Sequence, residues 1–305
     1  MKAVRFERFG GPEVLEVREV ERPSPPPGEV LVQVRAAAIN PGEIGIREGL
    51  LESRFPTSFP SGEGSDLAGT VAELGEGVDG FAVGDAVLGW TDRRASHAEY
   101  VVVPAGHLTA KPAQIPWEVA GSLYVAPLAA YASVRAVDPR EGEVVAVSAA
   151  AGGVGGVAVQ LARLRGARVI GLAGEANHEW LRSRGIVPVT YGDGQAERIR
   201  DAAGGTPDAF IDTFGGGYVD LAVELGVPVE RINTIADFAA IERLGVRGEG
   251  TGSVAAIEVV REIADRVADG SIEIPIAATF PLSEVRAAYT ELADRHTRGK
   301  IVLLA

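Results

Sequence analysis

Four glycines within five positions are the residues whose spacing most directly indicates chemistry: Gly152, Gly153, Gly155 and Gly156. They lie in VVAVSAAAGGVGGVAVQLA (144–162), a stretch without a charged residue. This stretch approaches the length of a membrane-spanning helix, and it contains the G-x-x-x-G spacing of packed membrane helices. However, each glycine in a helix interior costs about 1 kcal/mol relative to alanine, which disfavours one continuous helix through all four. We therefore interpret the stretch as a strand, a glycine turn and a helix.

The residues on both sides of the glycines support this interpretation. Residues 144–148 are short, apolar and β-branched, as in a buried strand, and 167–173 (ARVIGLA) is the next strand candidate. One helical face follows the turn, made of Val154, Val157, Ala158, Leu161 and Ala162. The turn itself satisfies the G-x-G-x-x-G/A fingerprint of dinucleotide binding, in which bare backbone and a helix N-terminus accept a pyrophosphate. The predicted cofactor contacts here are Gly152, Gly153, Val154 and Gly155; the alternative is a turn with only a structural role.

Further strands are expected downstream at the spacing of alternating strands and helices. The candidates are 187–191, 209–216 and 231–236. In an open parallel sheet a ligand lies across the carboxyl ends of the strands. This rule adds five predicted cofactor contacts, each of which could equally be a loop residue without a ligand: Thr213, Gly215, Thr234, Ile235 and Ala236.

The elements that must position these residues divide the chain into two parts. The first ~120 residues have the pattern of short strands separated by turns, which is typical of an all-β domain. The pattern predicts an α/β protein with a β domain over 1–121, completed by 253–305, and a doubly wound parallel-sheet domain over 122–252. Within 253–305 we expect an amphipathic helix, a strand over IEIPIAATF (272–280), a short helix and a last strand, GKIVLLA, and the late strands should return to the first domain.

Composition restricts the class of protein. The chain has 305 residues, 46% of them hydrophobic and 23% charged, with a net charge of −13 and no cysteine. The negative charge argues against nucleic-acid and anionic-membrane partners, and the absence of cysteine excludes disulfides and thiolate ligands and fits the cytoplasm. The first residues carry charges throughout, so we expect no signal peptide.

The sequence resembles a known family over essentially its whole length. The similar segments are MKAVRFERFGGPEVLEV, AAAINPGEIGIREG, GEGSDLAG, FAVGDAVLG, HAEYVVVPA, AAAGGVGGVAVQLA, FIDTFGG, FPLSEVRAAY and HTRGKIVL. Together they resemble the zinc-independent quinone oxidoreductases of the medium-chain dehydrogenase/reductase superfamily. The resemblance implies a GroES-like β domain, a Rossmann domain, and reduction of a quinone or α,β-unsaturated carbonyl by NADPH in the cleft between them.

The resemblance also separates this chain from the zinc-dependent relatives. Those proteins supply a cysteine near Asn40, place a His-Glu pair where this chain has Ser65-Asp66, and carry a four-cysteine lobe. The four histidines have no metal-ligand spacing, so we expect no zinc. In the family the pair Asn40-Pro41 lies beside the nicotinamide, and we carry both residues over as contacts; the alternative is that Asn40 only ends a strand.

The substrate pocket and the proton donor are less defined. Many relatives have a tyrosine at the position of Gly45, and a G-L-T motif where this chain has Pro127-Leu128-Ala129. No catalytic residue is therefore assigned. The pocket candidates are Asn40, Trp90, Thr91 and Tyr124, although the aromatic residues could equally be buried packing.

Cofactor choice depends on the end of the second strand. NAD enzymes place a carboxylate there, whereas this chain has the small, neutral Leu172-Ala173-Gly174, with Glu175 directly after it. His178 and Arg182 lie one helical turn apart and could bind a 2′-phosphate, and the family often has a tyrosine at Tyr191. NADP is therefore favoured over NAD, with Ala173, Gly174, His178, Arg182 and Tyr191 as contacts.

Two other functions stay open: an enoyl-thioester reductase, and an NADPH-binding protein of low turnover with a structural or redox-sensing role. For these two functions, as for the reduction of a quinone or enone, the expected partner is a small molecule. The family also implies a homodimer joined at the edge of the cofactor sheet, near residues 231–250.

Overall fold

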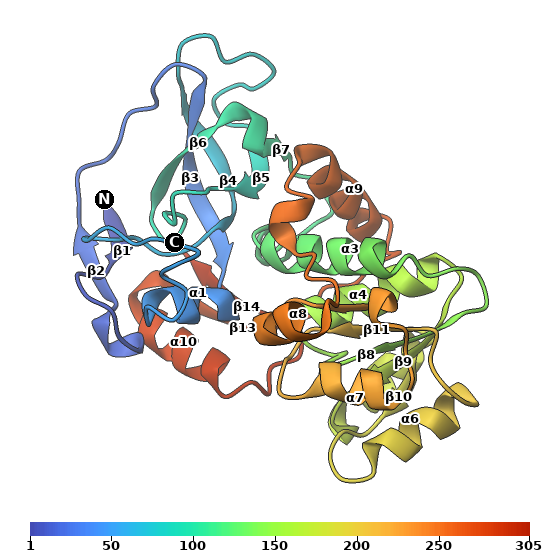
Figure 1. The fold of residues 1–305 in the computed structure, drawn as a ribbon. Helices are drawn as coiled ribbons and strands as arrows, with labels where there is room; N and C mark the ends of the chain where they lie inside the picture. The colour runs from blue at the N-terminus through green and yellow to red at the C-terminus, as the bar shows by residue number, and fades with distance from the viewer. The chain divides into compact units, whose positions relative to one another are not determined.

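The computed structural model describes residues 1–305, and the chain forms two compact units. Unit 1 comprises Met1–Val125, Ala256–Gly270 and Pro275–Ala305. Unit 2 comprises Ala126–Ala255 and Ser271–Ile274. Figure 1 shows the helices and strands of each unit.

A mixed sheet of seven strands forms unit 1, in the order β13-β14-β3-β4-β5-β7 with β6 also pairing with β3. All its pairs are antiparallel except β13 with β14. Because β14 pairs with β3, the C-terminal strands complete the N-terminal unit. The strands are β3 (Glu29–Ala38), β4 (Asp66–Leu74), β5 (Ala86–Trp90), β6 (Tyr100–Pro104), β7 (Leu108–Ala110), β13 (Ile276–Pro281) and β14 (Lys300–Leu304).

The apolar residues of this sheet build its core. Alternate valines of β3 pack with apolar residues of β4, β5 and β6, and all of these are buried. A second cluster joins β14 and helix α10 to the N-terminal segment. The remaining elements of unit 1 are β1 (Lys2–Arg5), β2 (Glu16–Glu19), α1 (Pro41–Arg47), α2 (Trp117–Ala120), α9 (Ile257–Ala268) and α10 (Val285–Ala293).

A parallel sheet of five strands forms unit 2, in the order β10-β9-β8-β11-β12. Helices alternate with the strands along the chain, as the spacing predicts. The strands are β8 (Val144–Val147), β9 (Arg168–Leu172), β10 (Val187–Val189), β11 (Ala209–Asp212) and β12 (Ile232–Thr234). The helices are α3 (Val125–Val137), α4 (Gly153–Leu164), α5 (His178–Ser183), α6 (Gln195–Ala203), α7 (Tyr218–Glu224) and α8 (Phe238–Leu244).

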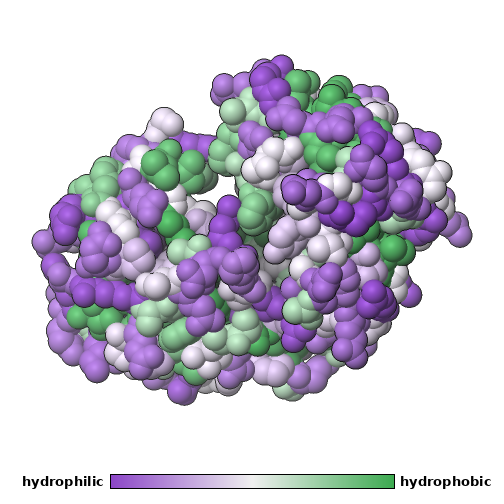
Figure 2. All heavy atoms as spheres, turned by 90° about the horizontal axis from the view of Figure 1, so that it is seen from below, coloured by the Kyte–Doolittle hydropathy of each residue, from purple (hydrophilic) through white to green (hydrophobic).

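The uncharged stretch is a strand, a turn and a helix, as predicted. The turn is shorter than its glycine content suggests, because α4 begins at Gly153 and three of the four glycines lie in its first two turns. Four of the five residues on the predicted helical face are buried, and Val154 is half-buried. No helix in the structure has the length and apolar character needed to cross a membrane. On the face drawn in Figure 2, hydrophobic patches are interrupted by hydrophilic residues.

Two expected segments differ from the structure. The strand predicted over 272–280 begins only at Ile276, because Gln160 of α4 donates to the carbonyl oxygen of Glu273 and accepts its N–H, both at 2.9 Å. Residues 271–274 therefore belong to unit 2. The outer edge of β12 is not free either, since Arg247 exchanges backbone hydrogen bonds with Ile232 and Thr234.

Candidate functional site

Two glycines of the turn between β8 and α4, Gly152 and Gly155, have different roles. A Cβ on Gly155 would lie 2.2 Å from the carbonyl oxygen of Ala149, so this glycine is needed for the helix to pack on its own turn, with or without a ligand. A Cβ on Gly152 would meet only that same oxygen, at 3.2 Å. Of these two glycines, Gly152 therefore has fewer and more distant atoms on the side where a Cβ would lie. The left-handed conformation of the turn falls on Ala149, with a φ of 45°, rather than on a glycine.

The start of α4 offers hydrogen-bond donors beside Gly152. The first helical bond runs from the N–H of Gly156 to the carbonyl oxygen of Gly152, at 2.8 Å. The N–H groups of Gly153, Val154 and Gly155 precede that bond, and such groups carry the positive end of the helix dipole. Donors next to an uncovered glycine fit a pyrophosphate group.

This turn also lies at the topological switch point of the sheet. β8 is central, with β9 and β10 following on one side and β11 and β12 on the other. The connections after β8 and β11 therefore leave the sheet in opposite directions, which opens a crevice at the carboxyl ends in folds of this kind. The predicted contacts Gly152, Thr213 and Gly215 come from the two loops that flank this point.

A buried carboxylate, Asp212, ties these loops together. It accepts hydrogen bonds from the hydroxyl groups of Ser148 and Thr234, each at 2.7 Å. It also accepts the backbone N–H groups of Phe214 and Gly215, at about 3.0 Å. The ends of β8, β11 and β12 are thereby fixed by one side chain that is fully buried.

The predicted contacts around Asp212 differ in accessibility. Thr234 is fully buried and gives its hydroxyl to Asp212, so in this structure it supports the loop rather than presenting a surface to a ligand. Thr213 is half-buried, and its hydroxyl donates to the carbonyl oxygen of Ser148 at 2.7 Å. Gly215 is buried, whereas Ile235 is half-buried and Ala236 is exposed.

The candidate residues for cofactor choice gather after β9. The His178 ring lies 3.2 Å from the carbonyl oxygen of Ala173, and Arg182 on the same helix is exposed without a hydrogen-bond or ion-pair partner. A Cβ on Gly174 would lie 3.6 Å from the Tyr191 hydroxyl, so the two positions are neighbours. Glu175 is exposed at the start of a short 3-10 helix. The structure therefore brings the predicted residues together at the end of one strand.

A second polar network lies inside unit 1 and is centred on Asn40, the residue before α1. Its side-chain nitrogen donates to Asp66 at 2.8 Å, and its oxygen accepts from the ammonium group of Lys300 at 2.5 Å. Lys300 also donates to the carbonyl oxygen of Ile39. Asp66 in turn accepts the N–H groups of Tyr124 and Val125, at the start of α3. All three side chains are buried.

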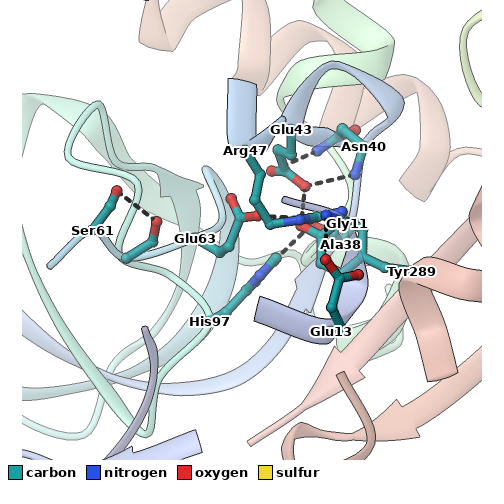
Figure 3. A network of polar contacts seen from close by, with 11 residues as sticks. Gly11, Glu13, Ala38, Asn40, Glu43, Arg47, Ser61, Glu63, His97 and Tyr289 are labelled. Atoms are coloured by element: carbon teal, nitrogen blue, oxygen red, sulfur yellow. Dashed lines mark hydrogen bonds and ion pairs between the residues drawn. The ribbon is translucent and has the colours of Figure 1, made fainter. Parts of the chain in front are cut away.

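Figure 3 shows the neighbouring part of this network. Glu43 accepts from the backbone N–H of Asn40 and from the hydroxyl of Tyr289, at 2.8 and 2.7 Å. Arg47 donates to Glu63 at 2.8 Å and lies over the ring of Tyr289. These ionisable groups are all buried, so each depends on its neighbours for compensation.

Burial controls the protonation of these groups. It raises the pKa of Glu63 to about 8, with the charge of Glu43 as a second cause and with Arg47 acting in the opposite direction. Burial also raises the pKa of Asp66, against the opposing charge of Lys300. The pKa of Lys300 is lowered by burial, although Asp66 and Glu43 act in the opposite direction. For His97, burial lowers the pKa and favours the neutral ring.

The residues at the metal-ligand positions do not fit a zinc ion. Both amide atoms of Asn40 are bonded, and both oxygens of Asp66 accept hydrogen bonds. A buried cation, Lys300, already faces these groups, and a second cation would be repelled by it. No group of three metal-ligating side chains is present in residues 1–305.

The remaining pocket candidates form part of an aromatic stack. The Trp90 ring is nearly parallel to those of Tyr124 and His107, with centroids 4.6 and 4.2 Å away. Thr91 is buried, and its hydroxyl accepts the N–H of Arg93. Trp90 and Thr91 are therefore packed positions, whereas Tyr124 has a hydroxyl without a partner in the protein.

Sequence reasoning did not identify Asp212, Lys300 or the pair Arg47–Glu63. The available signal was a charged residue at the first or last position of an apolar strand, as in AFID and GKIVLLA. Such a residue is either exposed or specifically paired, and sequence alone does not supply the partner.

Comparison with known proteins agrees with this architecture. A family model described as the alcohol dehydrogenase GroES-like domain matches residues 26–113, and one described as zinc-binding dehydrogenase matches residues 186–303. The chain is 31% identical to a quinone oxidoreductase of Pseudomonas aeruginosa, over 99% of both sequences.

Solved structures show the same fold. The quinone oxidoreductase of Coxiella burnetii is 30% identical, with a TM-score of 0.90 over 100% of this chain and 99% of that one. The quinone oxidoreductase of Escherichia coli, solved in complex with NADPH, is 24% identical, with a TM-score of 0.88 over all of both chains. The GroES-like and Rossmann-like units predicted from the sequence are thus confirmed, and the chain belongs to the quinone oxidoreductase family of the medium-chain dehydrogenase/reductase superfamily.

Proposed function

We propose that this protein is an NADPH-dependent oxidoreductase that reduces a quinone or an α,β-unsaturated carbonyl compound without a metal ion. One observation carries the proposal: at the switch point of the parallel sheet, a Cβ on Gly152 would meet only one backbone oxygen, and the first N–H groups of α4 lie next to this glycine. A dinucleotide pyrophosphate needs both features.

The dinucleotide would be held by groups from three loops. The N–H groups of Gly153, Val154 and Gly155 would bind the pyrophosphate. Thr213 and Gly215 would flank it from the loop after β11, held in place by Asp212. Asn40, Pro41, Ile235 and Ala236 remain proposed contacts on the strength of the family resemblance and of their places in the chain.

The choice of NADPH over NADH rests on the loop after β9. Arg182 is exposed without a partner, and His178 on the same helix is half-buried with Nε2 3.2 Å from the carbonyl oxygen of Ala173, so Arg182 and the other ring nitrogen of His178 would bind a 2′-phosphate. Glu175 is the competing residue, because a carboxylate there could accept the ribose 2′-hydroxyl of NADH. Two basic residues against one acidic residue favour NADPH.

The kind of acceptor follows from the absence of metal ligands in the donor set of unit 1. A bound nicotinamide supplies a hydride. Reduction of an isolated carbonyl places negative charge on one oxygen, which a metal ion commonly stabilises. In a conjugated acceptor the charge is delocalised onto an oxygen remote from the carbon that receives the hydride, so a hydrogen-bond donor is sufficient.

NADPH oxidation followed by absorbance tests this proposal with matched acceptors. We expect turnover with 1,4-naphthoquinone and with cyclohex-2-enone, and none with cyclohexanone, which lacks the conjugated alkene. The rates should be unchanged in a strong chelator. Turnover of cyclohexanone, or loss of activity on chelation, would contradict the metal-free assignment. Binding of NADPH without turnover of any acceptor would favour the redox-sensing alternative.

We also propose a homodimer, through the edge of the unit 2 sheet. β12 is covered by the segment around Arg247, whose backbone pairs with it. The outer face of residues 246–250 would then be the surface that pairs with a second copy. Sedimentation at micromolar concentration should give twice the monomer mass, and a monomer there would contradict this proposal.

A further inference from the structure

The Tyr124 hydroxyl differs from that of the other largely buried tyrosine in unit 1. The hydroxyl of Tyr289 donates to Glu43 at 2.7 Å, inside the buried network. Tyr124 is only 7% exposed, yet its hydroxyl has no hydrogen-bond partner in the protein and is not among the fully buried polar atoms. A buried phenol usually finds a partner. The accessible part of this side chain therefore includes a free donor.

The ring that carries this hydroxyl is held in one orientation. Trp90 lies parallel to it, with an interplanar angle of 4° and a centroid distance of 4.6 Å. Trp90 is covered on its other face by His107, at 4.2 Å. A ring packed in such a stack loses little further freedom when its hydroxyl binds a ligand.

The backbone of Tyr124 is held by the same carboxylate that orients Asn40. Asp66 accepts the Tyr124 N–H on one oxygen, at 2.9 Å, and the Asn40 amide on the other, at 2.8 Å. Asn40 keeps almost no free bonding capacity, because its amide nitrogen faces two carboxylates and its oxygen faces Lys300. Of these two residues, only Tyr124 has an unused donor.

We propose that Tyr124 is a catalytic residue, whose phenol donates a hydrogen bond to the carbonyl oxygen of a quinone or enone substrate. This inference rests on the proposed function. In the reduction of an enone, a C–H bond of NADPH would break as a new C–H bond forms at the alkene carbon, so that NADPH is oxidised to NADP⁺ and the π electrons move onto the carbonyl oxygen. The hydrogen bond from Tyr124 stabilises that oxygen while it is negatively charged, and the product then takes one proton from water.

The surroundings of Tyr124 keep its proton in place. Burial raises the pKa of Tyr124, and the charges of Asp92 and Asp66 raise it further. The residue therefore stays neutral across the physiological range and acts as a donor rather than as a source of phenolate. A neutral, fixed donor suits an oxygen whose charge develops only during the reaction.

The test uses Tyr124→Phe, which keeps the ring stack and removes only the hydroxyl, with Tyr100→Phe on β6 as the matched control. The probe is 4-(dimethylamino)cinnamaldehyde, a conjugated aldehyde whose absorption band moves to longer wavelength when its oxygen accepts a hydrogen bond. Its spectrum is recorded with each protein, without turnover. NADPH affinity by titration, the kcat and KM for cyclohex-2-enone, and the melting temperature are measured on the same samples.

We expect a red shift with the wild type and with Tyr100→Phe, and its loss with Tyr124→Phe. The kcat should fall roughly 100-fold in Tyr124→Phe, the effect of removing one donor to a developing oxyanion, with NADPH affinity and melting temperature unchanged. A full red shift or an unchanged kcat in Tyr124→Phe would overturn the inference, as would a wild type that gives no shift. A shift that depends on Tyr124 in a protein that does not oxidise NADPH would support the hydrogen bond from Tyr124 to the carbonyl oxygen, but would reject the proposed activity and with it the catalytic role.

Discussion

Two buried carboxylates, Asp66 in unit 1 and Asp212 in unit 2, have similar structural roles but different hydrogen-bond partners. Each accepts two backbone N–H groups and connects segments that are distant in sequence. Asp212 completes its bonding with two hydroxyl groups, from Ser148 and Thr234. Asp66 instead bonds the Asn40 amide, which in turn binds the cation Lys300.

Asp212 is therefore held by neutral hydrogen-bond donors, whereas Asp66 belongs to a network that includes a cation. In unit 2, hydroxyl and backbone donors fix the loops around a predicted ligand site, and the ligand-facing groups are left free. In unit 1, charged groups compensate one another in the interior, and removing one leaves its partner buried without compensation. The two networks should therefore respond very differently to single substitutions.

The largest expected effect is on stability, from Lys300→Met. The change removes the hydrogen bonds of the buried ammonium group to Ile39 and Asn40, and with them the positive charge that acts on Asp66 and Glu43. Since a hydrogen bond to a charged group contributes about 1.5–3 kcal/mol, we expect a loss of about 3–5 kcal/mol. The counterpart in unit 2, Ser148→Ala, removes one of the four donors to Asp212 and the acceptor of the Thr213 N–H, without removing a charge, and should cost about 1.5–3 kcal/mol. The free energy of unfolding is measured by denaturant titration. Equal losses from the two variants would show that the charge of Lys300 adds nothing beyond its hydrogen bonds.

The next effect is the pH dependence of stability that comes from Glu63. Its pKa is about 8 in the folded protein and near 4.5 when unfolded, so the folded state binds the extra proton between these values. Stability from this group is fully present below pH 4.5 and is lost as the pH rises towards 8. We expect Glu63→Gln to flatten this decline of stability between pH 5 and 8, because glutamine does not titrate.

The groups that face Glu63 define the controls for this measurement. Glu43, Arg47 and Arg94 act on its charge, and Asp66, whose pKa is also raised by burial, contributes a slope of the same sign. Glu76→Gln, at an exposed position without an ion-pair partner, should leave the curve of unfolding free energy against pH unchanged. If the wild-type and Glu63→Gln curves run parallel from pH 5 to 8, Glu63 is ionised in the folded state.

A smaller effect is expected on cofactor choice in unit 2. Replacing both His178 and Arg182 with alanine should weaken NADPH binding, because each charge-assisted bond to a phosphate contributes about 1.5–3 kcal/mol. NADH, which lacks the 2′-phosphate, should bind nearly as before. Titration of the wild type and the variant with NADPH and with NADH measures this difference in affinity. An equal loss for the two, or an original preference for NADH, would assign the ribose contact to Glu175.

The sequence predicted one of these two regions much better than the other. In unit 2 the period of the strands, the glycine turn and the apolar face of α4 are local patterns, so the parallel sheet and the turn were both predictable. After β9 the structure places the His178 ring beside Ala173 and Gly174 beside Tyr191, and their role as cofactor contacts stays a prediction.

The network of unit 1 could not be predicted, because it joins residues far apart in the chain. Lys300 and Asn40 are 260 positions apart, and no periodicity links them. The strand boundary at 272–280 was wrong for a related reason, since the backbone of Glu273 is bonded by the side chain of Gln160 from another element. Local patterns also did not show which glycine packs against its own turn, since that depends on the carbonyl oxygen of Ala149.

The central claim is that the turn after β8 exists to hold a dinucleotide, and Gly152 tests it most directly. Gly152→Ala adds one methyl group where only the Ala149 oxygen is near, whereas Gly155→Ala would distort the turn itself. Gly252→Ala, where a Cβ meets nothing within 4 Å, is the neutral control. NADPH affinity by titration and melting temperature by calorimetry are measured on one sample of each. We predict that Gly152→Ala binds NADPH at least tenfold more weakly and loses much less melting temperature than Gly155→Ala; a folded Gly152→Ala protein with unchanged NADPH affinity would contradict this role of the turn.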